Sequence, residues 1–260
     1  MQVWHMNGAG NDFLVLDARK KRLDFENLAK KYCAQLGADG LMAIDNSEKA
    51  DFRLHFYNAD GSRGEMCGNG SRCVCRFAHA LGIVGSTMTL ETDAGLVCGW
   101  RLDESTYRVR LNDPAVLDLN RKSGIAYTEL GCPGVPHAVT EMPGLQWDNR
   151  DALREKARAL RFDPAFSNGA NVNFYTWLAP GRIRLLTFER GVEDFTLACG
   201  TGTGSAAVVL WAQGKLPEGR LIAENMGGTL TATVQAENGR ATALLLEGPT
   251  QVTEILELPI

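Results

Sequence analysis

The sequence carries the motif Cys-Gly-x-Gly twice, and this repetition limits the folds open to the chain more than any other feature. Cys67 opens the first copy in "EMCGNGS", and Cys199 opens the second in "LACGTGT", 132 positions later. The same spacing separates five further pairs of identical residues: Gly68 and Gly200, Gly70 and Gly202, Gly82 and Gly214, Leu54 and Leu186, and Phe56 and Phe188. A repeat at about half the length of the chain predicts two similar domains rather than a solenoid of short repeats.

The elements expected around the two motifs follow one order in both halves. A strand-like run ("DFRLHFYN", "RIRLLTFER") precedes a loop, the motif, an apolar helix ended by glycine, and further strands. The helical segments "CVCRFAHALG" and "SAAVVLWAQG" are apolar over most of their circumference, so we expect each to be enclosed by a sheet. We therefore predict an α+β fold of two pseudo-symmetric domains, 1–116 and 117–260, each a mixed sheet or barrel wrapped around a central helix. We expect the active site in the cleft between the domains; whether the last strand returns to the first domain is left open.

Composition and charge narrow the class of partner. The chain is 45% hydrophobic and 22% charged, with a formal net charge of −4 and no basic footprint for nucleic acid. The first residues show no secretory signal, and no apolar run approaches the length of a membrane span. Seven cysteines in such a chain favour reduced thiols over a disulfide framework. We expect a cytoplasmic protein that acts on a small molecule, with neither nucleic acid nor membrane as partner; a homodimer is left open.

Both motifs stand just ahead of a predicted helix, where backbone N–H groups and the helix dipole form a site for an anion. The same dipole favours the thiolate of a cysteine placed there, so Cys67 and Cys199 are candidates for chemistry. We expect the remaining cysteines to be small buried hydrophobes: Cys33, Cys73, Cys75, Cys98 and Cys132. The glycine spacing fits neither a dinucleotide-binding fingerprint nor a P-loop, and the cysteines and histidines lack the spacing of a zinc site.

Two thiols beside an anion site suit the inversion of a carbon stereocentre. A proton must leave one face of the carbon and another must arrive at the opposite face, which calls for one unprotonated and one protonated group of matched pKa. Backbone amides at the helix ends can hold the carboxylate of an amino acid and stabilise the charge that builds as the α-proton departs. This scheme needs no cofactor and no metal.

Six motifs in order along the chain resemble the diaminopimelate epimerase family: "MNGAGNDF", "GADG", "NADGSRGEMCGNGSRC", "PHAV", "NVNF" and "ERG…LACGTG". The resemblance implies two similar domains and a pyridoxal-independent epimerisation of LL- to meso-diaminopimelate, a step towards lysine and peptidoglycan precursors. It implies that Cys67 and Cys199 are the acid–base pair and that His137 and Glu189 assist proton transfer. It further implies that the distal end of the substrate is bound by Asn11, Asn58, Asn171 and Arg190, and the reacting carboxylate by Gly68, Asn69, Gly200 and Thr201.

Two departures from the family pattern keep other functions open. Val135 stands where much of the family has asparagine in "GNPH", and Phe195 stands where many members have glutamate. Because specificity depends on how polar groups of the substrate are paired, a related cofactor-independent racemase of another amino acid, such as histidine, is an alternative. A non-catalytic module that binds a small molecule is a further alternative, in which one cysteine would be expendable.

Overall fold

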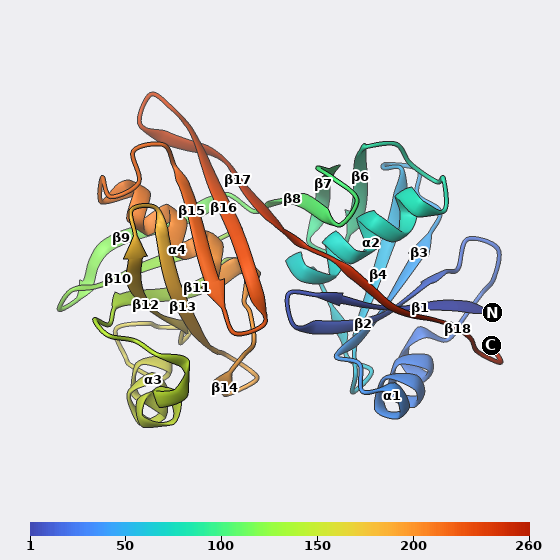
Figure 1. Ribbon diagram of the computed structural model, residues 1–260, viewed down its shortest axis with the longest axis horizontal. Helices are drawn as coiled ribbons and strands as arrows, with labels where there is room; N and C mark the ends of the chain where they lie inside the picture. Colours follow the sequence, from blue (N-terminus) through green and yellow to red (C-terminus); the bar gives the residue numbers. More distant parts are fainter. The chain divides into compact units, whose positions relative to one another are not determined.

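The computed structural model describes residues 1–260 and shows an α+β protein in which strands predominate (Figure 1). The chain divides into two compact units: unit 1 comprises Met1–Arg110 and Glu247–Ile260, and unit 2 comprises Leu111–Leu246. The α+β class therefore agrees with the sequence prediction. The predicted boundary at residue 116 falls inside a strand of unit 2, and the final strand belongs to unit 1.

Unit 1 is a mixed sheet with two helices. Its strands are β1 (Gln2–Gly8), β2 (Asn11–Asp17), β3 (Gly40–Asp45), β4 (Phe52–Asn58), β5 (Arg63–Gly64), β6 (Thr87–Thr92), β7 (Gly95–Arg101), β8 (Thr106–Leu111) and β18 (Gln251–Glu257). The helices are α1 (Phe25–Leu36) and α2 (Gly68–Ala80). Parallel pairs β2–β3 and β4–β6 are set among antiparallel neighbours, which gives the mixed sheet expected from the sequence.

Unit 2 repeats this plan. Its strands are β9 (Pro114–Lys122), β10 (Ile125–Leu130), β11 (Val135–Glu141), β12 (Asn171–Ala179), β13 (Arg182–Glu189), β14 (Asp194–Phe195), β15 (Arg220–Asn225), β16 (Gly228–Glu237) and most of β17 (Arg240–Pro249). The helices are η1 (Trp147–Leu153, a 3₁₀ helix), α3 (Arg154–Arg161) and α4 (Gly200–Ala212). Parallel pairs β11–β12 and β13–β15 stand where unit 1 has β2–β3 and β4–β6.

The two central helices correspond residue for residue. Both α2 and α4 have 13 residues, and their bounds differ by the 132 positions found in the sequence. Within unit 1, α2 packs on β1, β2, β3 and β7, and within unit 2, α4 packs on β9 to β12, β15 and β16. Their flanking sheets bury nearly every residue of both helices, as the apolar pattern predicts. One residue breaks that pattern, because α2 buries the guanidinium of Arg72.

Glycines end both central helices as the sequence predicts. Gly82 and Gly214 have φ values of 67° and 72°, in the left-handed region that favours glycine. After α2, the N–H of Gly82 bonds to the carbonyl of His79 and that of Ile83 to the carbonyl of Ala78. This pair of bonds is a Schellman motif, which satisfies carbonyls at the helix end.

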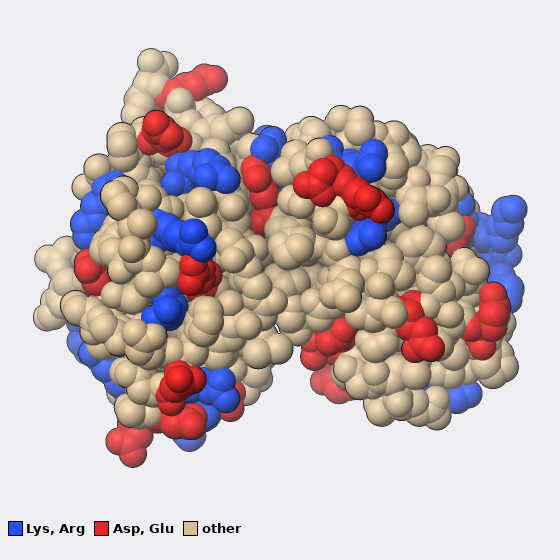
Figure 2. Space-filling model, viewed as in Figure 1, with Lys and Arg blue, Asp and Glu red and all other residues tan.

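Charged side chains of both signs are interspersed on the face of each unit drawn in Figure 2. Neither unit shows there a broad field of one sign that would attract nucleic acid. A search of the helices for a segment long and apolar enough to cross a bilayer finds none.

The glycine at the end of α2 provides a first test of the fold. We expect Gly82→Ala to lower the free energy of unfolding by about 1 kcal/mol, because alanine is strained at positive φ. Gly85→Ala is a matched control: a Cβ there also meets nothing within 4 Å, but the backbone lies outside the left-handed region. It should change stability by no more than about 0.5 kcal/mol. Urea titration measures both, and equal losses in the two variants would contradict the assignment.

Candidate active site

Cys67 is the N-cap residue of α2. Its backbone is extended (φ −131°, ψ 118°), and its Sγ accepts a hydrogen bond from the N–H of Gly70 at 3.5 Å. The first bond of the helix backbone runs from the N–H of Ser71 to the Cys67 carbonyl. The thiol therefore takes the position at which an N-cap side chain binds an unpaired N–H of the first turn. Cys67 is partly exposed, whereas Gly68 and Asn69 are buried.

A chain of amides lies beside Cys67. Asn69 Nδ2 donates to Asn11 Oδ1 at 2.7 Å, and Asn11 Nδ2 donates to Asp39 Oδ2 at 3.1 Å. The same carboxylate oxygen accepts from the N–H of Asp12 at 2.9 Å. The structure thus brings Asn11 and Asn69 together. Asp39, which the sequence analysis did not single out, accepts a hydrogen bond from Asn11.

Asn58 ends β4 at the same edge of the unit 1 sheet. It pairs with Gly40 on β3, and Gly40 in turn pairs with Phe13, two residues beyond Asn11 on β2. Its Nδ2 donates to Ser62 Oγ at 2.9 Å, so part of its role is to close the local turn.

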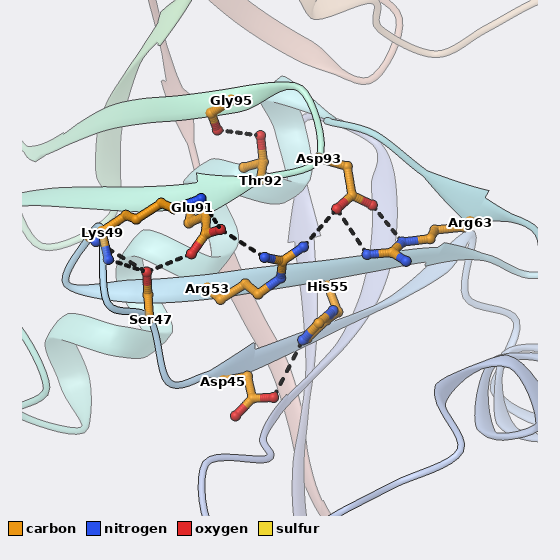
Figure 3. Close-up of polar contacts among 11 residues, drawn as sticks. Asp45, Ser47, Lys49, Arg53, His55, Arg63, Glu91, Thr92, Asp93 and Gly95 are labelled. Atoms are coloured by element: carbon orange, nitrogen blue, oxygen red, sulfur yellow. Dashed lines mark hydrogen bonds and ion pairs between the residues drawn. The ribbon is translucent and has the colours of Figure 1, made fainter.

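An ion-pair network fixes the strand that leads into Cys67 (Figure 3). Arg53 on β4 contacts Glu91 at 2.7 Å and Asp93 at 3.0 Å, and Asp93 also binds Arg63 on the two-residue strand β5. Glu91 accepts a further bond from Ser47. Isolated surface pairs add little stability, but a shared network holds several strands in one arrangement. Here it holds β5 just before the loop that ends at Cys67.

Cys199 holds the equivalent position in unit 2. It is the N-cap of α4, with an extended backbone (φ −116°, ψ 115°), and its Sγ accepts from the N–H of Gly202 at 3.3 Å. The hydroxyl of Thr201 lies 3.5 Å from the same sulfur. Cys199 is buried, with 6% of its surface exposed. Both motif cysteines therefore cap corresponding helices through the same backbone contact.

Burial and Glu189 both disfavour the thiolate of Cys199. Burial raises the pKa of the Cys199 thiol well above its usual value, the charge of Glu189 raises it further, and the two side chains share a hydrogen bond. Burial also raises the pKa of Glu189, which accepts a bond from Thr196 Oγ1 at 2.5 Å. At Cys199, burial and the carboxylate thus oppose the thiolate that the helix N-terminus is expected to favour.

His137 is a buried residue of β11. Burial and the charge of Arg190 lower its pKa to about 3, so the imidazole is neutral near pH 7. Its Nδ1 lies 3.1 Å from Asn173 Nδ2. Asn171 Nδ2 lies 3.5 Å from Nε2, so an amide donor faces each ring nitrogen. His137 is therefore a neutral ring held between the amides of Asn171 and Asn173.

Asn171 joins His137 to the predicted site. It pairs with His137 across the parallel strands β11 and β12, and its Nδ2 donates to the Pro136 carbonyl at 3.1 Å. Its Oδ1 accepts from the N–H of Arg190 at 2.8 Å. The exposed Arg190 side chain donates to the Asn168 carbonyl at 3.0 Å. Within unit 2 the structure thus groups Asn171 with His137 and Arg190.

Two buried residues that the sequence analysis missed support this group. Asn173 Nδ2 donates to the Ala138 carbonyl at 3.0 Å, and its Oδ1 accepts from Thr187 Oγ1 at 2.9 Å. A Cβ on Gly202 would lie 2.5 Å from Asn173 Oδ1 and 2.9 Å from Thr187 Oγ1. The motif glycine is therefore required for α4 to approach β12 and β13. The only sequence signal for Asn173 is its place in "NVNF".

The five cysteines outside the motifs differ in burial, and the two residues that depart from the family pattern, Val135 and Phe195, lie in different surroundings. Cys33, Cys73 and Cys75 are buried as predicted, Cys98 is partly exposed, and Cys132 is exposed, contrary to expectation. Phe195 packs among Phe174 and Phe188 and belongs to the core of unit 2. Val135 begins β11, partly exposed and two residues before His137.

Each unit has a helix N-terminus capped by a sulfur, with the amide chain of Asn69 and Asn11 in unit 1 and the carboxylate of Glu189 beside Cys199 in unit 2. No group of three His, Cys, Asp or Glu side chains is arranged to hold a metal ion.

A family model described as "Diaminopimelate epimerase" matches residues 3–116 and 132–252. The chain belongs to the diaminopimelate epimerase family. The diaminopimelate epimerase of Aquifex aeolicus is 37% identical over 233 residues, covering 82% of each chain. That of Flavobacterium psychrophilum is 32% identical over 262 residues, covering 96% of this chain and 97% of the relative. Membership confirms the resemblance and makes the chain an isomerase of the epimerase type.

The fold extends to more distant proteins. The crystal structure of a probable proline racemase from Agrobacterium radiobacter K84 superimposes with a TM-score of 0.70 and 18% identity, covering 100% of this chain and 93% of that one. At this identity the likeness concerns the fold alone. It confirms the predicted α+β architecture of two pseudo-symmetric halves.

The protonation of His137 can be measured directly. We expect its ¹⁵N resonances to report a neutral ring throughout roughly pH 5 to 9, because burial disfavours the imidazolium. Its pKa of about 3 lies below the unfolded value of 6.5. The unfolded chain therefore binds this proton first, and stability that is complete above pH 6.5 is lost as the pH falls towards 3. A titration midpoint near 6.5 in the folded protein would contradict this account.

Proposed function

We propose that this protein inverts one α-carbon of LL-diaminopimelate to give meso-diaminopimelate, without pyridoxal phosphate, using Cys67 and Cys199 as the acid–base pair. One observation carries the proposal: both motif cysteines cap the N-termini of corresponding helices in a duplicated fold. Membership of the epimerase family supports the reaction class and the substrate.

In the proposed mechanism one sulfur acts as a thiolate and the other as a thiol. The thiolate takes the α-proton, the electron pair of the broken C–H bond moves onto the α-carbon and its carboxylate, and the thiol on the opposite face supplies a proton to the same carbon. The reaction ends with the two protonation states exchanged and no net change in protons. Amides of the first turns, Gly68 with Asn69 and Gly200 with Thr201, would hold the carboxylate where negative charge builds.

Glu189 and His137 are proposed to assist the half of the site in unit 2. The hydrogen bond between Glu189 and Cys199 would keep that sulfur protonated until the carbanion forms. His137, neutral in the folded protein, would form a hydrogen bond with the substrate rather than act as a cation. General acid–base groups of this kind contribute about 10²- to 10⁴-fold in rate.

The distal end of the substrate is assigned to four polar side chains: Asn11, Asn58, Asn171 and Arg190. The exposed Arg190 guanidinium suits the second carboxylate of a diacid, because it can donate two parallel hydrogen bonds. Val135 offers no amide near this region. If the distal contacts select another amino acid, the protein is instead a related racemase, and substrate comparison decides between the two.

This function places the protein in the synthesis of lysine and peptidoglycan precursors. We propose a cytoplasmic enzyme whose only partner in the reaction is the amino-acid substrate. A homodimer is compatible with the proposal but plays no part in the chemistry.

The two thiols can be tested separately. We expect Cys67→Ser and Cys199→Ser each to reduce epimerisation of LL-diaminopimelate by at least about 10³-fold, since a hydroxyl ionises far too weakly to replace a thiol. Cys132→Ser is the matched control, because Cys132 is an exposed thiol outside both helix ends, and it should retain full activity. Chiral chromatography of the product measures the rate.

The same assay separates the candidate functions. LL-diaminopimelate should be inverted faster than histidine and a panel of other amino acids at equal concentration. Faster inversion of another amino acid would replace diaminopimelate as substrate and keep the thiol chemistry. Full activity in either the Cys67→Ser or the Cys199→Ser variant would refute the two-thiol scheme. If the protein inverts no amino acid at all, the remaining candidate function is a non-catalytic module that binds a small molecule.

The role of Glu189 has its own matched pair of variants. We expect Glu189→Gln to slow epimerisation about 10²-fold, because the amide cannot accept the thiol proton as a carboxylate does. Glu193 lies four residues further on and pairs with Arg161. Glu193→Gln should leave the rate within about twofold, since its ion pair lies away from Cys199 and such pairs add little energy. Equal rates in the two variants would remove Glu189 from the mechanism.

A further inference from the structure

Arg72 is the one charged side chain buried inside a central helix. It is 0% exposed, and its guanidinium lies under the first turn of α2. Nη1 donates to the Gly68 carbonyl at 3.2 Å, and Nη2 donates to Asn69 Oδ1 at 3.0 Å. Nε has no hydrogen-bond partner, and Arg72 forms no ion pair with a carboxylate. A buried arginine without a counter-ion is costly, so a compensating negative charge is to be expected nearby.

The duplicated fold shows that this charge is confined to one half. The residue 132 positions after Arg72 is Gly204 on α4. A Cβ there would lie 2.8 Å from Leu111 Cδ1 and 2.9 Å from Leu244 Cδ2, so leucines pack closely against this position of α4. Cys67 therefore has a fixed cation behind its helix end, whereas Cys199 has apolar side chains there and a carboxylate beside it.

Among the groups around Arg72, the sulfur of Cys67 is the one whose negative charge would balance the guanidinium. Arg72 interacts electrostatically with Cys67, Cys73 and Cys75. Burial raises the pKa of Cys73 to about 12 and raises that of Cys75 further, so both remain thiols. Cys67 is partly exposed and capped by an amide, which suits a thiolate.

Other charged groups packed around α2 have partners of their own. Asp12 on β2 lies near Cys73 and accepts a hydrogen bond from Asn7 Nδ2 at 3.2 Å. Arg76, one turn further along α2, donates to the Thr250 carbonyl. Tyr107 on β8 is influenced by Arg76, Arg101 and Cys75, and burial raises its pKa, so it stays neutral. None of these supplies Arg72 with an anion.

Arg72 also sets the direction of the amide chain. A guanidinium only donates, so Asn69 must turn its Oδ1 towards Arg72 and its NH₂ towards Asn11. Asn11 then accepts through Oδ1 and donates through Nδ2 to Asp39. One buried donor thus fixes the orientation of Asn69 and Asn11, two of the three asparagines assigned to the substrate in unit 1.

We propose that Arg72 is a positioning residue that makes Cys67 the thiolate and Cys199 the thiol of the resting enzyme. This inference rests on the proposed function, since it assigns starting roles to the same two sulfurs. Cys67 would take the α-proton from substrate bound to the resting enzyme, and Cys199 would supply the replacement. Arg72 contacts neither substrate nor reacting atom and acts through Cys67 and Asn69.

The test is the pH dependence of alkylation at each cysteine of the intact protein. Iodoacetamide reacts with thiolates, and peptide mass spectrometry separates Cys67 from the other six cysteines. For each cysteine, the pH at which alkylation reaches half its maximum rate is compared rather than the rate itself, because Cys199 is less accessible to the reagent. This pH is called the midpoint. We expect the Cys67 midpoint to lie at least about one pH unit below that of Cys199. A Cys199 midpoint at or below that of Cys67 would overturn the proposal.

Variants of Arg72 test whether its guanidinium causes the difference between the midpoints of Cys67 and Cys199. Arg72→Met should raise the Cys67 midpoint by about one pH unit or more, which slows its alkylation near pH 7 about tenfold, and leave Cys199 unchanged. Arg72→Lys should restore part of the shift. Arg76→Met is the matched control, with the same change on the same helix one turn away, and should not move Cys67. An unchanged Cys67 midpoint in Arg72→Met would refute the role.

A second variant keeps the test decisive if Arg72→Met does not fold. Asn69→Asp gives the guanidinium a carboxylate partner, so the Cys67 midpoint should again rise; no rise would overturn the proposal. Because alkylation needs no substrate, its result stands whether or not LL-diaminopimelate is turned over. A failed assignment of Arg72 is thereby distinguished from a failed assignment of the reaction.

Discussion

The structure depends on a single contact made twice, a backbone N–H of a helix's first turn donating to the sulfur of the residue that caps it. Gly70 donates to Cys67 and Gly202 to Cys199, at 3.5 and 3.3 Å. For the contact to form, the chain must enter each helix extended and the third residue after the sulfur must be free of a Cβ, as the crowding around Gly202 shows. The duplicated sheets serve to hold the two helix ends in this form.

What surrounds the two sulfurs is not duplicated. A buried cation lies behind Cys67, whereas Glu189 and neutral His137 lie in the half that carries Cys199. The proposed mechanism requires one thiolate and one thiol, and unequal surroundings would decide which sulfur keeps the proton before substrate binds. The departures from internal symmetry are thus more informative about mechanism than the symmetry itself.

The sequence predicted those parts of the molecule that rest on local patterns. The repeat at 132 positions, the apolar runs and the terminal glycines were sufficient for the α+β class, the two central helices and the ends at Gly82 and Gly214. It could not show that His137 lies buried in a strand, because that depends on pairing with Asn171, 34 positions away. Nor could it show that Arg72 is buried without a carboxylate, because an arginine on a helix is ordinarily exposed. The burial that disfavours a thiolate at Cys199 is likewise a property of packing.

The measurement that tests two opposed thiols most directly is the position of deuterium early in the reaction. LL-diaminopimelate is incubated with the protein in deuterated water, and both epimers are recovered after a small fraction has turned over. If one sulfur removes the proton and the other delivers a different one, the meso product carries deuterium at the inverted carbon while the recovered LL substrate still carries protium. Deuterium appearing equally in substrate and product at that stage would show a single base serving both faces and would contradict the account.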